Sequence, residues 1–445
     1  MQQEHSHFSA DLVIEAAWVI PVQPDGVVLD NYAVAVAEGT IAALLPWDEM
    51  KTRCSAAQTC RLDSHVLIPG LVNLHTHAAM TLMRGLADDL KLMSWLTNHI
   101  WPAESKHVSA QFVRDGTLQA CAEMLRGGVT CFNDMYFFPE MAGQAALEAG
   151  MRAALGIVVI EFPTNYANDP QDYLRKGLAM RDELKQEQLL SFCMAPHAPY
   201  TVSDKTFENI LMLSEQLQIP INTHLHETRD EIKESLSKFG MRPMARLDKL
   251  GVLGANFLAV HAVHLEDSEI ALLAQAGCSV AHCPSSNLKL ASGISPVDRM
   301  LAAGINVGVG TDGAASNNRL DVFCEMRLAA LLAKAASDNA ETVPAHTALR
   351  MATYNAAQAL GLERSLGSIE PGKSADLCAV NLDSLELAPC YDPASHLVYA
   401  AGRENVSDVW VAGRHLVGSG RLLHMDEQRI RHKAAEWKSR ILGTT

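Results

Sequence analysis

The chain has 445 residues, of which 48% are hydrophobic and 20% are charged. This apolar fraction excludes a mainly disordered chain, and the length allows several domains or one large barrel with an accessory domain. Lys and Arg number 36 against 51 Asp and Glu, which gives a formal net charge of −15. Because a surface of this sign repels phosphate groups, we expect neither nucleic acid nor a membrane surface as a partner.

The cysteine pattern and the N-terminal segment indicate a cytoplasmic protein. The 10 cysteines form no Cys-x-x-Cys motif, so we expect buried thiols in a reducing compartment. No basic stretch followed by an apolar one opens the chain, so we expect no signal peptide. The longest stretch without Asp, Glu, Lys or Arg, residues 64–83, contains Pro69, Gly70, His75 and His77, which a membrane helix does not tolerate readily.

Both ends of the chain are rich in predicted strands. Apolar runs over residues 11–22 and 32–46 are interrupted by turn residues, and residues 366–382 and 406–420 show a similar pattern. Because the ends of a barrel chain lie close together, we expect residues 1–67 and 367–445 to form one small β-sandwich domain, followed by a terminal helix. Two independent flaps are the alternative.

Between these ends, residues 68–366 alternate short apolar strands with amphipathic helices. The strand-like runs cover residues 66–77, 128–135, 151–160, 189–200, 220–227, 257–265, 278–287 and 305–315. This alternation is typical of a parallel barrel, so the predicted fold class is α/β, a TIM-like (β/α)8 barrel with a β-sandwich built from both chain ends. The active face of such a barrel lies at the carboxyl ends of its strands.

Four of the predicted strands end in histidine or aspartate. His75 and His77 point to the same face, because side chains alternate along a strand. His224 and His261 end two later strands, and Asp312 follows the last one. A single strand-terminal histidine is usually a structural group, but four strands that end this way predict a metal site.

Three imidazoles and one carboxylate suit Zn²⁺, and Fe²⁺ or Mn²⁺ fit the same ligands. With water as a further ligand, the site is open and therefore catalytic. A binuclear site commonly has a modified lysine as a bridge, but residues 128–135, 151–160 and 189–197 contain no lysine. We therefore expect one ion per chain, which suits the attack of water on a ring carbon that carries an amine.

Glu227 lies three residues after His224 and is the expected general acid/base, with a solvated loop glutamate as the alternative. His226, His264 and His282 are less well placed, and we do not expect them to bind the metal. The sequence after His226 excludes the His-Glu-x-x-His motif of zincin proteases. The chain also lacks the motif of the small zinc nucleobase deaminases.

The segments at residues 69–77 (PGLVNLHTH) and 310–318 (GTDGAASNN), with the candidate ligands, resemble the amidohydrolase superfamily. Nearly the whole chain is similar to the 5-methylthioadenosine/S-adenosylhomocysteine deaminases. This closer resemblance covers residues 83–90, 94–96, 101–104, 195–200, 284–290 and 367–377. Related chlorohydrolases and other aminohydrolases share much of this pattern.

The resemblance implies roles for the polar residues at the strand ends. The metal ligands would be His75, His77, His224 and Asp312, with Zn²⁺ as the expected ion. His261 would hydrogen-bond the metal's water, Glu227 would carry a proton to the ring nitrogen, and Asp312 would pass a proton to leaving ammonia. In substrate binding, His197 would contact the purine ring and Glu104 would receive the two ribose hydroxyls, beside Glu227 and Asp312.

This sequence departs from the family pattern at one position that bears on which substrate is accepted. Family members that hold the homocysteine carboxylate carry an arginine after the strand that begins Met-Arg-Ala, but residues 153–162 contain no basic residue here. Because a carboxylate would lose a charge-assisted pair, we expect hydrolytic deamination of 5′-methylthioadenosine, with S-adenosylhomocysteine and adenosine as further candidate substrates. An aminohydrolase or chlorohydrolase of a free base or triazine, and a catalytically silent scaffold, are the alternatives. We also expect a homo-oligomer.

Overall fold

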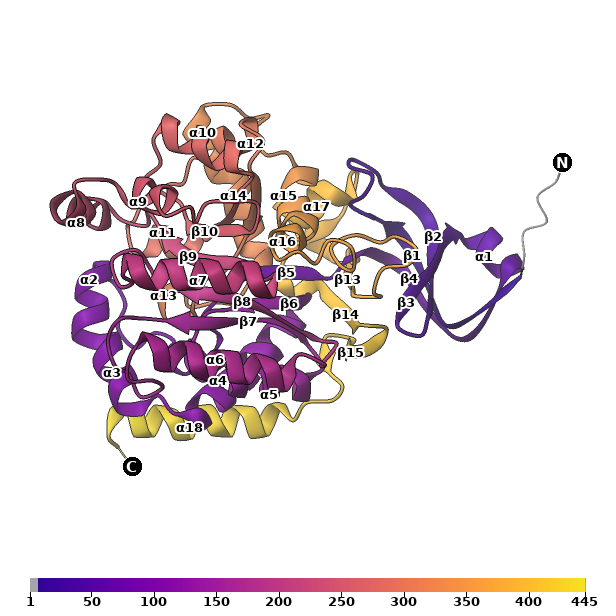
Figure 1. Cartoon of the computed structure of the whole chain (residues 1–445). Helices are drawn as coiled ribbons and strands as arrows, with labels where there is room; N and C mark the ends of the chain where they lie inside the picture. The colour runs from indigo at the N-terminus through magenta and orange to yellow at the C-terminus, as the bar shows by residue number, and fades with distance from the viewer. Residues whose placement is uncertain (1–6, 445) are drawn as a thin grey trace.

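The structure is a computed structural model and describes residues 7–444. Its main sheet is parallel, and its eight strands neighbour one another in chain order. Figure 1 shows strands of this sheet at the centre of the larger body, with helices around them. These strands are β5 (Leu71–Thr76), β6 (Val129–Asp134), β7 (Arg152–Val159), β8 (Leu190–Pro196), β9 (Ile221–Leu225), β10 (Phe257–His261), β11 (Ser279–His282) and β12 (Asn306–Val309). They coincide with the eight strand-like runs, so the predicted barrel is confirmed. The prediction of no signal peptide rests partly on residues 1–6, which lie outside the described range.

The barrel closes where its first strand meets its last. The amide of Asp312 donates to the carbonyl oxygen of His75 over 2.9 Å, and the side chain of Asn73 forms two hydrogen bonds with Thr311. Gly310 permits this approach, since a Cβ atom there would lie 2.7 Å from the amide nitrogen of His75. Two of the predicted metal ligands are therefore neighbours across the closing seam.

Every residue of β5, β6, β9, β10 and β11 is buried. Helices cover such a parallel sheet on the outside and side chains fill its interior, which explains the nearly continuous apolar sequence of these strands. A polar side chain is costly in this setting unless it has a partner. The buried histidines of β5, β9 and β10 are therefore candidates for a functional site.

The two ends of the chain share a second sheet, in the order β16-β15-β14-β13-β4-β1-β2-β3. Its strands are β1 (Phe8–Val19), β2 (Leu29–Ala37), β3 (Thr40–Pro46), β4 (Cys54–Pro69), β13 (Leu377–Asn381), β14 (Val406–Val411), β15 (Arg414–Gly418) and β16 (Arg421–Leu422). Strand β4 pairs with β1 on one side and with β13 on the other. One accessory domain from both ends is thus confirmed, and the alternative of two independent flaps is wrong.

This second sheet carries apolar side chains on both faces. Val34 and Val36 belong to one buried cluster, whereas their neighbours Ala33 and Ala35 belong to another. The lobe formed by β1 to β4 and the short helix α1 (Trp47–Arg53) projects from the barrel (Figure 1). The domain boundaries at residues 67–68 and 366–367 stay a prediction.

Most of the remaining helices surround the barrel. The remaining α-helices are α2 (Leu92–Trp95), α3 (Trp101–His107), α4 (Ala110–Arg126), α5 (Pro139–Ala149), α6 (Pro170–Leu184), α7 (Asp204–Leu217), α8 (Arg229–Phe239), α9 (Pro243–Lys249), α10 (Asp267–Ala276), α11 (Pro284–Lys289), α12 (Val297–Ala302), α13 (Ala314–Asn317), α14 (Val322–Ser337), α15 (Ala345–Met351), α16 (Tyr354–Ala359), α17 (Pro393–Tyr399) and α18 (Glu427–Leu442). The predicted terminal helix is α18, whose Trp437 packs on Phe112 of α4 and donates to Asp115. None of the helices in residues 7–444 combines the length and apolar character needed to cross a membrane.

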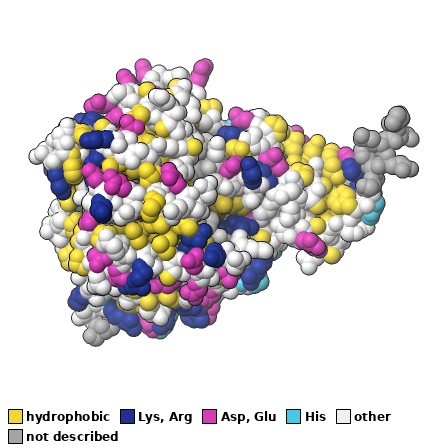
Figure 2. All heavy atoms as spheres, viewed as in Figure 1, with side chains coloured by type: hydrophobic (Ala, Val, Ile, Leu, Met, Phe, Trp, Pro, Cys, Tyr) yellow, Lys and Arg dark blue, Asp and Glu magenta, His cyan; other side chains and the backbone are white. Residues whose placement is uncertain are grey.

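The connection from β5 to α4 is long and carries part of the candidate site. It contains a 3₁₀ helix (Ala78–Met83), α2, a π-helical turn (Leu96–Ile100) and α3. Trp95, Trp101 and Glu104 of this connection line the main cavity. On the face shown in Figure 2, acidic and basic side chains are interspersed rather than gathered by sign.

Candidate active site

The four predicted metal ligands, His75, His77, His224 and Asp312, meet with His261 at the carboxyl ends of the barrel strands. Nε2 of His224 lies 3.1 Å from Nε2 of His75. Oδ1 of Asp312 lies 3.6 Å from Nε2 of His75 and 3.2 Å from Nε2 of His77. A ring nitrogen of His261 lies within 4.8 Å of those of His75 and His224. The structure therefore brings all five residues together.

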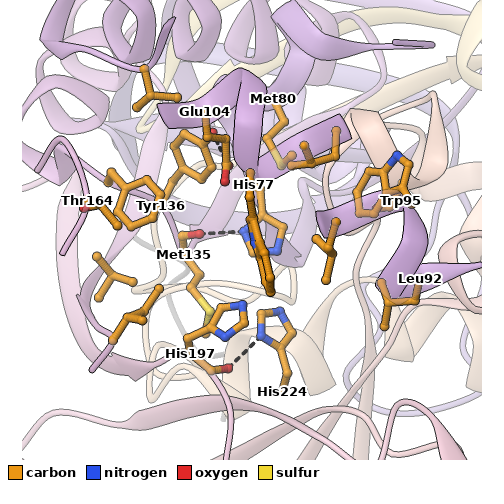
Figure 3. A pocket seen from close by; sticks show the side chains of 18 of the residues that line it. His77, Met80, Leu92, Trp95, Glu104, Met135, Tyr136, Thr164, His197 and His224 are labelled. Atoms are coloured by element: carbon orange, nitrogen blue, oxygen red, sulfur yellow. Dashed lines mark hydrogen bonds between the residues drawn. The ribbon is translucent and has the colours of Figure 1, made fainter. Parts of the chain in front are cut away.

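Hydrogen bonds to main-chain carbonyl groups orient two of these imidazoles. Nδ1 of His77 donates to Met135 over 2.5 Å, and Nδ1 of His224 donates to His197 over 2.7 Å (Figure 3). Because a carbonyl oxygen only accepts, Nε2 of the neutral ring presents its lone pair to the centre of the site. Metal-ligating histidines are oriented in this way. The Nε2 atoms of His75, His77 and His224 and a carboxylate oxygen of Asp312 thus converge on one point, and this donor set fits a metal ion.

The ionisation of these groups also suits a cation. Burial lowers the pKa of His75 to about 4 and holds the pKa of His224 well below its ordinary value, so both rings are neutral donors. Burial acts on His77 in the same direction, but Asp312 outweighs it and raises the pKa of His77 to about 9. A cation bound at Nε2 of His77 would displace this proton.

The Asp312 carboxylate is fixed from several sides. Its Oδ2 accepts hydrogen bonds from the hydroxyls of Ser286 and Ser316 over 2.6 and 2.7 Å, and its Oδ1 accepts from the amide of Gly313 over 2.8 Å. Asp312 and His261 both adopt left-handed backbone conformations, with φ of 61° and 72°. Such conformations cost about 1–3 kcal/mol outside glycine and cluster at functional sites.

We call His75, His77, His224 and Asp312 the metal-binding group. Glu227 and His261 face each other beside this group. Oε2 of Glu227 lies 3.9 Å from Nε2 of His261, and the two residues are 7% and 1% exposed. Nδ1 of His261 pairs with Oδ1 of Asn287 over 2.9 Å, which leaves Nε2 free to accept a hydrogen bond. Burial raises the pKa of Glu227, which suits a group that takes up and releases a proton.

A cavity of about 280 Å³ opens in front of these residues. Glu104 and His197, the predicted substrate-binding residues, both line it (Figure 3). Burial raises the pKa of Glu104 to about 7 and lowers that of His197 to about 3. Much of the wall is apolar: Leu92, Trp95, Leu96, Ile100, Trp101, Val108, Val158, Ile160, Phe162 and Leu290. No Lys or Arg is found among the described residues that line the cavity.

The three less well placed histidines lie outside this arrangement. Nε2 of His226 accepts from the amide of Met244 over 3.1 Å, so this ring points away from the metal-binding group. His264 lines a separate surface pocket. His282 is buried at the end of β11, and its Nδ1 has no hydrogen-bond partner in the described part of the chain.

Several residues that position the site were not among the predicted site residues. These residues form hydrogen bonds, through a side-chain hydroxyl or amide group, that hold the predicted residues or the helix that carries one of them. They are Tyr136, Asn165, Ser286, Asn287 and Ser316. Three of these residues lie within the segments 284–290 and 310–318 that carry the family resemblance. Tyr136 and Asn165 lie in βα loops, and no periodic pattern marks them.

Comparison with known proteins gives consistent matches. The amidohydrolase family model matches residues 66–416. The 5-methylthioadenosine/S-adenosylhomocysteine deaminase of Saccharophagus degradans is 45% identical over 432 residues, which cover 97% of each chain. A crystal structure of an adenosine deaminase from Xanthomonas campestris with bound zinc has a TM-score of 0.97 at 46% identity and covers 98% of this chain and 100% of its own. Atrazine chlorohydrolase from Arthrobacter aurescens, complexed with zinc, has a TM-score of 0.89 at 25% identity and covers 96% of this chain and 100% of its own.

These matches show that the chain belongs to the amidohydrolase family. Members of this family depend on a metal ion, and the cluster of His75, His77, His224, His261 and Asp312 is where this chain can hold one. Within the family, the similarity over nearly the full length places the chain among the 5-methylthioadenosine/S-adenosylhomocysteine deaminases.

Proposed function

We propose that this protein catalyses the hydrolytic deamination of 5′-methylthioadenosine and related adenosines, with an inosine-type product and ammonia. One observation carries the proposal: the metal-binding group, Glu227 and Glu104 face a single cavity, and no Lys or Arg lines it among the described residues. The names of the full-length relatives support the same substrate class.

The proposal assigns one divalent ion, Zn²⁺, to His75, His77, His224 and Asp312. The ion supplies positive charge that lowers the pKa of water and so provides the nucleophile. A single ion is proposed because the described lining of the cavity contains no lysine that could bridge two ions. The zinc found in the related adenosine deaminase supports the choice of metal.

The protein's own groups would then move two protons. His261 would hold the attacking water through a hydrogen bond accepted at Nε2. One water proton would pass through Glu227 to the ring nitrogen beside the attacked carbon. Asp312 would take the second proton and transfer it to the amino group, so that the C–N bond breaks and ammonia leaves while the new C–O bond becomes a carbonyl.

His197 and Glu104 would hold the nucleoside. Nδ1 of His197 pairs with the hydroxyl of Thr201 over 2.9 Å, which leaves Nε2 for the purine ring. An ionised carboxylate accepts two hydrogen bonds from a vicinal diol, and Glu104 offers this group. Trp101 and Phe162, with ring centroids 6.2 Å apart, provide apolar surface for the 5′ substituent.

The alternatives fit the cavity less well. A free base or a triazine has no diol and would leave the Glu104 carboxylate without its partners, which is costly for a group in this setting. A silent scaffold would not need a complete ligand set together with Glu227. We also propose a cytoplasmic location, supported by the fact that all 10 cysteines are free. The homo-oligomer and the exclusion of nucleic acid and membrane partners stay predictions.

The test is ammonia release from a panel of compounds after reconstitution with Zn²⁺, Fe²⁺ or Mn²⁺ separately. The panel contains 5′-methylthioadenosine, adenosine, S-adenosylhomocysteine, adenine and a chlorotriazine. We expect the highest kcat/KM for 5′-methylthioadenosine. Chloride release from the triazine, or turnover of adenine alone, would support the runner-up enzyme class instead, and no turnover with any metal would support the scaffold.

A further inference from the structure

A second residue, Tyr136, contacts the carboxylate that we assign to the ribose. The Tyr136 hydroxyl donates a hydrogen bond to Oε1 of Glu104 over 2.7 Å, and both side chains line the cavity near His77 (Figure 3). Tyr136 follows β6, whereas Glu104 lies on α3, so two separate connections meet at this bond. Only 5% of Tyr136 is exposed, and its ring packs against Phe137 with centroids 5.3 Å apart.

The helix that carries Glu104 is anchored by other contacts. Nδ2 of Asn165 donates to the carbonyl oxygens of Ser105 and Val108, over 2.9 Å in each case. These bonds hold the C-terminal end of α3 to the loop after β7. Main-chain contacts thus hold this helix independently of Tyr136, whose hydroxyl bonds the side chain of Glu104.

This bond has a geometric consequence for the carboxylate. A glutamate side chain at a cavity wall rotates among several rotamers, and fixing one of them before the ligand arrives lowers the entropic cost of binding. An ionised carboxylate has about four lone-pair positions. The bond to Tyr136 uses one of them on Oε1, so Oε2 and the remaining position on Oε1 stay available for hydroxyl donors in the cavity.

The protonation states of Tyr136 and Glu104 also favour a hydroxyl donor on Tyr136 and an acceptor on Glu104. Burial raises the pKa of Tyr136 well above its ordinary value, so its hydroxyl remains a donor at neutral pH. Burial raises the pKa of Glu104, and the hydrogen bond from Tyr136 opposes this rise. A donor on Oε1 thus favours the ionised carboxylate, which is the form that accepts hydrogen bonds from a diol.

From this geometry we propose that Tyr136 is a specificity-determining positioning residue: its hydroxyl orients the Glu104 carboxylate as an acceptor for the 2′- and 3′-hydroxyls of a ribose. The inference rests on the proposed function. Tyr136 would not touch the reacting ring atoms. Its effect would be confined to substrates that carry the diol.

Tyr136→Phe tests the proposal, because it removes one hydroxyl and keeps the ring. The substrates are adenosine and 2′,3′-dideoxyadenosine, which differ only in the diol. We expect the variant to lose about tenfold in kcat/KM for adenosine, as for one hydrogen bond to a charged group. The loss should lie in KM, with kcat nearly unchanged. The kcat/KM for 2′,3′-dideoxyadenosine should stay within about twofold of the wild-type value.

Two further variants separate positioning from a general structural effect. If Tyr136 acts through Glu104, Tyr136→Phe should have no additional effect in a Glu104→Ala background, so that the double-mutant cycle is non-additive. Tyr166→Phe is the matched control. Tyr166 is a buried tyrosine whose hydroxyl has no hydrogen-bond partner among residues 7–444. This control should match the wild type with both substrates.

Equal losses with both substrates, additive effects in the cycle, or an unchanged adenosine KM would overturn the proposal. Calorimetric binding of inosine and 2′,3′-dideoxyinosine gives a readout that does not need turnover. The wild type could release no ammonia and still bind inosine more tightly than 2′,3′-dideoxyinosine. If Tyr136→Phe then removed this difference in affinity, the proposed function would fail and this inference would stand. If the wild type neither turned over nor bound ribosides, both would fail.

Discussion

Nε2 of His75 and Nε2 of His224 lie 3.1 Å apart, although 149 positions separate the two residues in the chain. The carbonyl oxygen bonded to Nδ1 of His224 directs the lone pair of its Nε2 toward His75. With Nε2 of His77 and Oδ1 of Asp312 beside them, these two nitrogens can hold one cation, which would tie four strand ends together. We therefore expect chelation of the metal to abolish activity and to lower the melting temperature, as measured by calorimetry.

Elemental analysis of purified protein should find about one divalent ion per chain. His75→Ala should lose both the ion and the activity, because it removes one of the two facing nitrogens. His282→Asn is a suitable control, since His282 is also buried at a strand end but lies outside the metal-binding group. It should keep the ion. Two ions per chain would contradict the mononuclear site.

Glu227→Gln keeps the shape of the side chain and removes its titratable proton. A positioned general acid/base contributes about 10²–10⁴-fold to the rate, so kcat should fall by this factor while the metal content stays at the wild-type level. Pre-steady-state and steady-state kinetics with adenosine would measure the loss. A kcat near the wild-type value would transfer the role to another group, with His261 as the first candidate.

Glu104→Ala tests what selects a riboside. We expect kcat/KM for 5′-methylthioadenosine to fall about 10–100-fold, because hydrogen bonds to a charged group are lost. The 2′-deoxy analogue should react much less efficiently than the riboside in the wild type, and the variant should narrow this gap. An unchanged ratio between riboside and 2′-deoxyriboside would mean that another residue receives the diol.

The absence of Lys and Arg from the described cavity lining predicts that 5′-methylthioadenosine has a higher kcat/KM than S-adenosylhomocysteine. Phe162, which is 40% exposed at the cavity, offers a place to reverse this preference. Phe162→Arg should improve the ratio for S-adenosylhomocysteine about tenfold through a charge-assisted pair, whereas Phe162→Gln should not. A wild-type preference for S-adenosylhomocysteine would point to a cation contributed by a neighbouring subunit.

The pH dependence of substrate binding should report on Glu104. Burial raises its pKa from 4.5 to about 7, so the carboxyl becomes protonated and loses acceptor capacity as the pH falls through this value. The KM for 5′-methylthioadenosine should therefore rise at low pH and level off at high pH. The positive charge of a bound ion near His77 lowers the inflection below the value for the metal-free protein.

Kinetics of Glu104→Gln at the same pH values is the control, since glutamine does not titrate. This variant should show no inflection in KM attributable to residue 104. A wild-type KM that stays constant between about pH 8 and about pH 5.5 would contradict the assignment of the diol to Glu104.

The barrel and the meeting of the candidate metal ligands at one end of it were predictable because both depend on local sequence, whereas the ligand roles stay a prediction. Buried parallel strands are short apolar runs, so the polar residues at their ends, such as His75 and His224, are conspicuous. The contacts that orient these residues were not predictable. The bond from Tyr136 to Glu104 joins the loop after β6 to α3, and the bond from His261 to Asn287 joins β10 to α11. Their geometry depends on loop conformations that have no periodic sequence signal.

Contacts between distant segments were equally unpredictable in the second sheet. Strand-like runs at both ends of the chain indicated its components, but not that β13 would pair with β4 while β1 pairs with the other side of β4. Apolar alternation in a strand specifies a buried face and not a neighbour.

The pairing of β4 with β13 also constrains how the protein is made. The side chains of Ser64 in β4 and Asn381 in β13 are hydrogen-bonded although 317 positions separate them. During synthesis, one edge of β4 therefore has no native partner until almost the whole chain has left the ribosome. The free N–H and C=O groups of an unpaired edge strand can form hydrogen bonds with other chains. We therefore expect a nascent chain that ends before β13 to associate with other chains more readily than the full-length protein does.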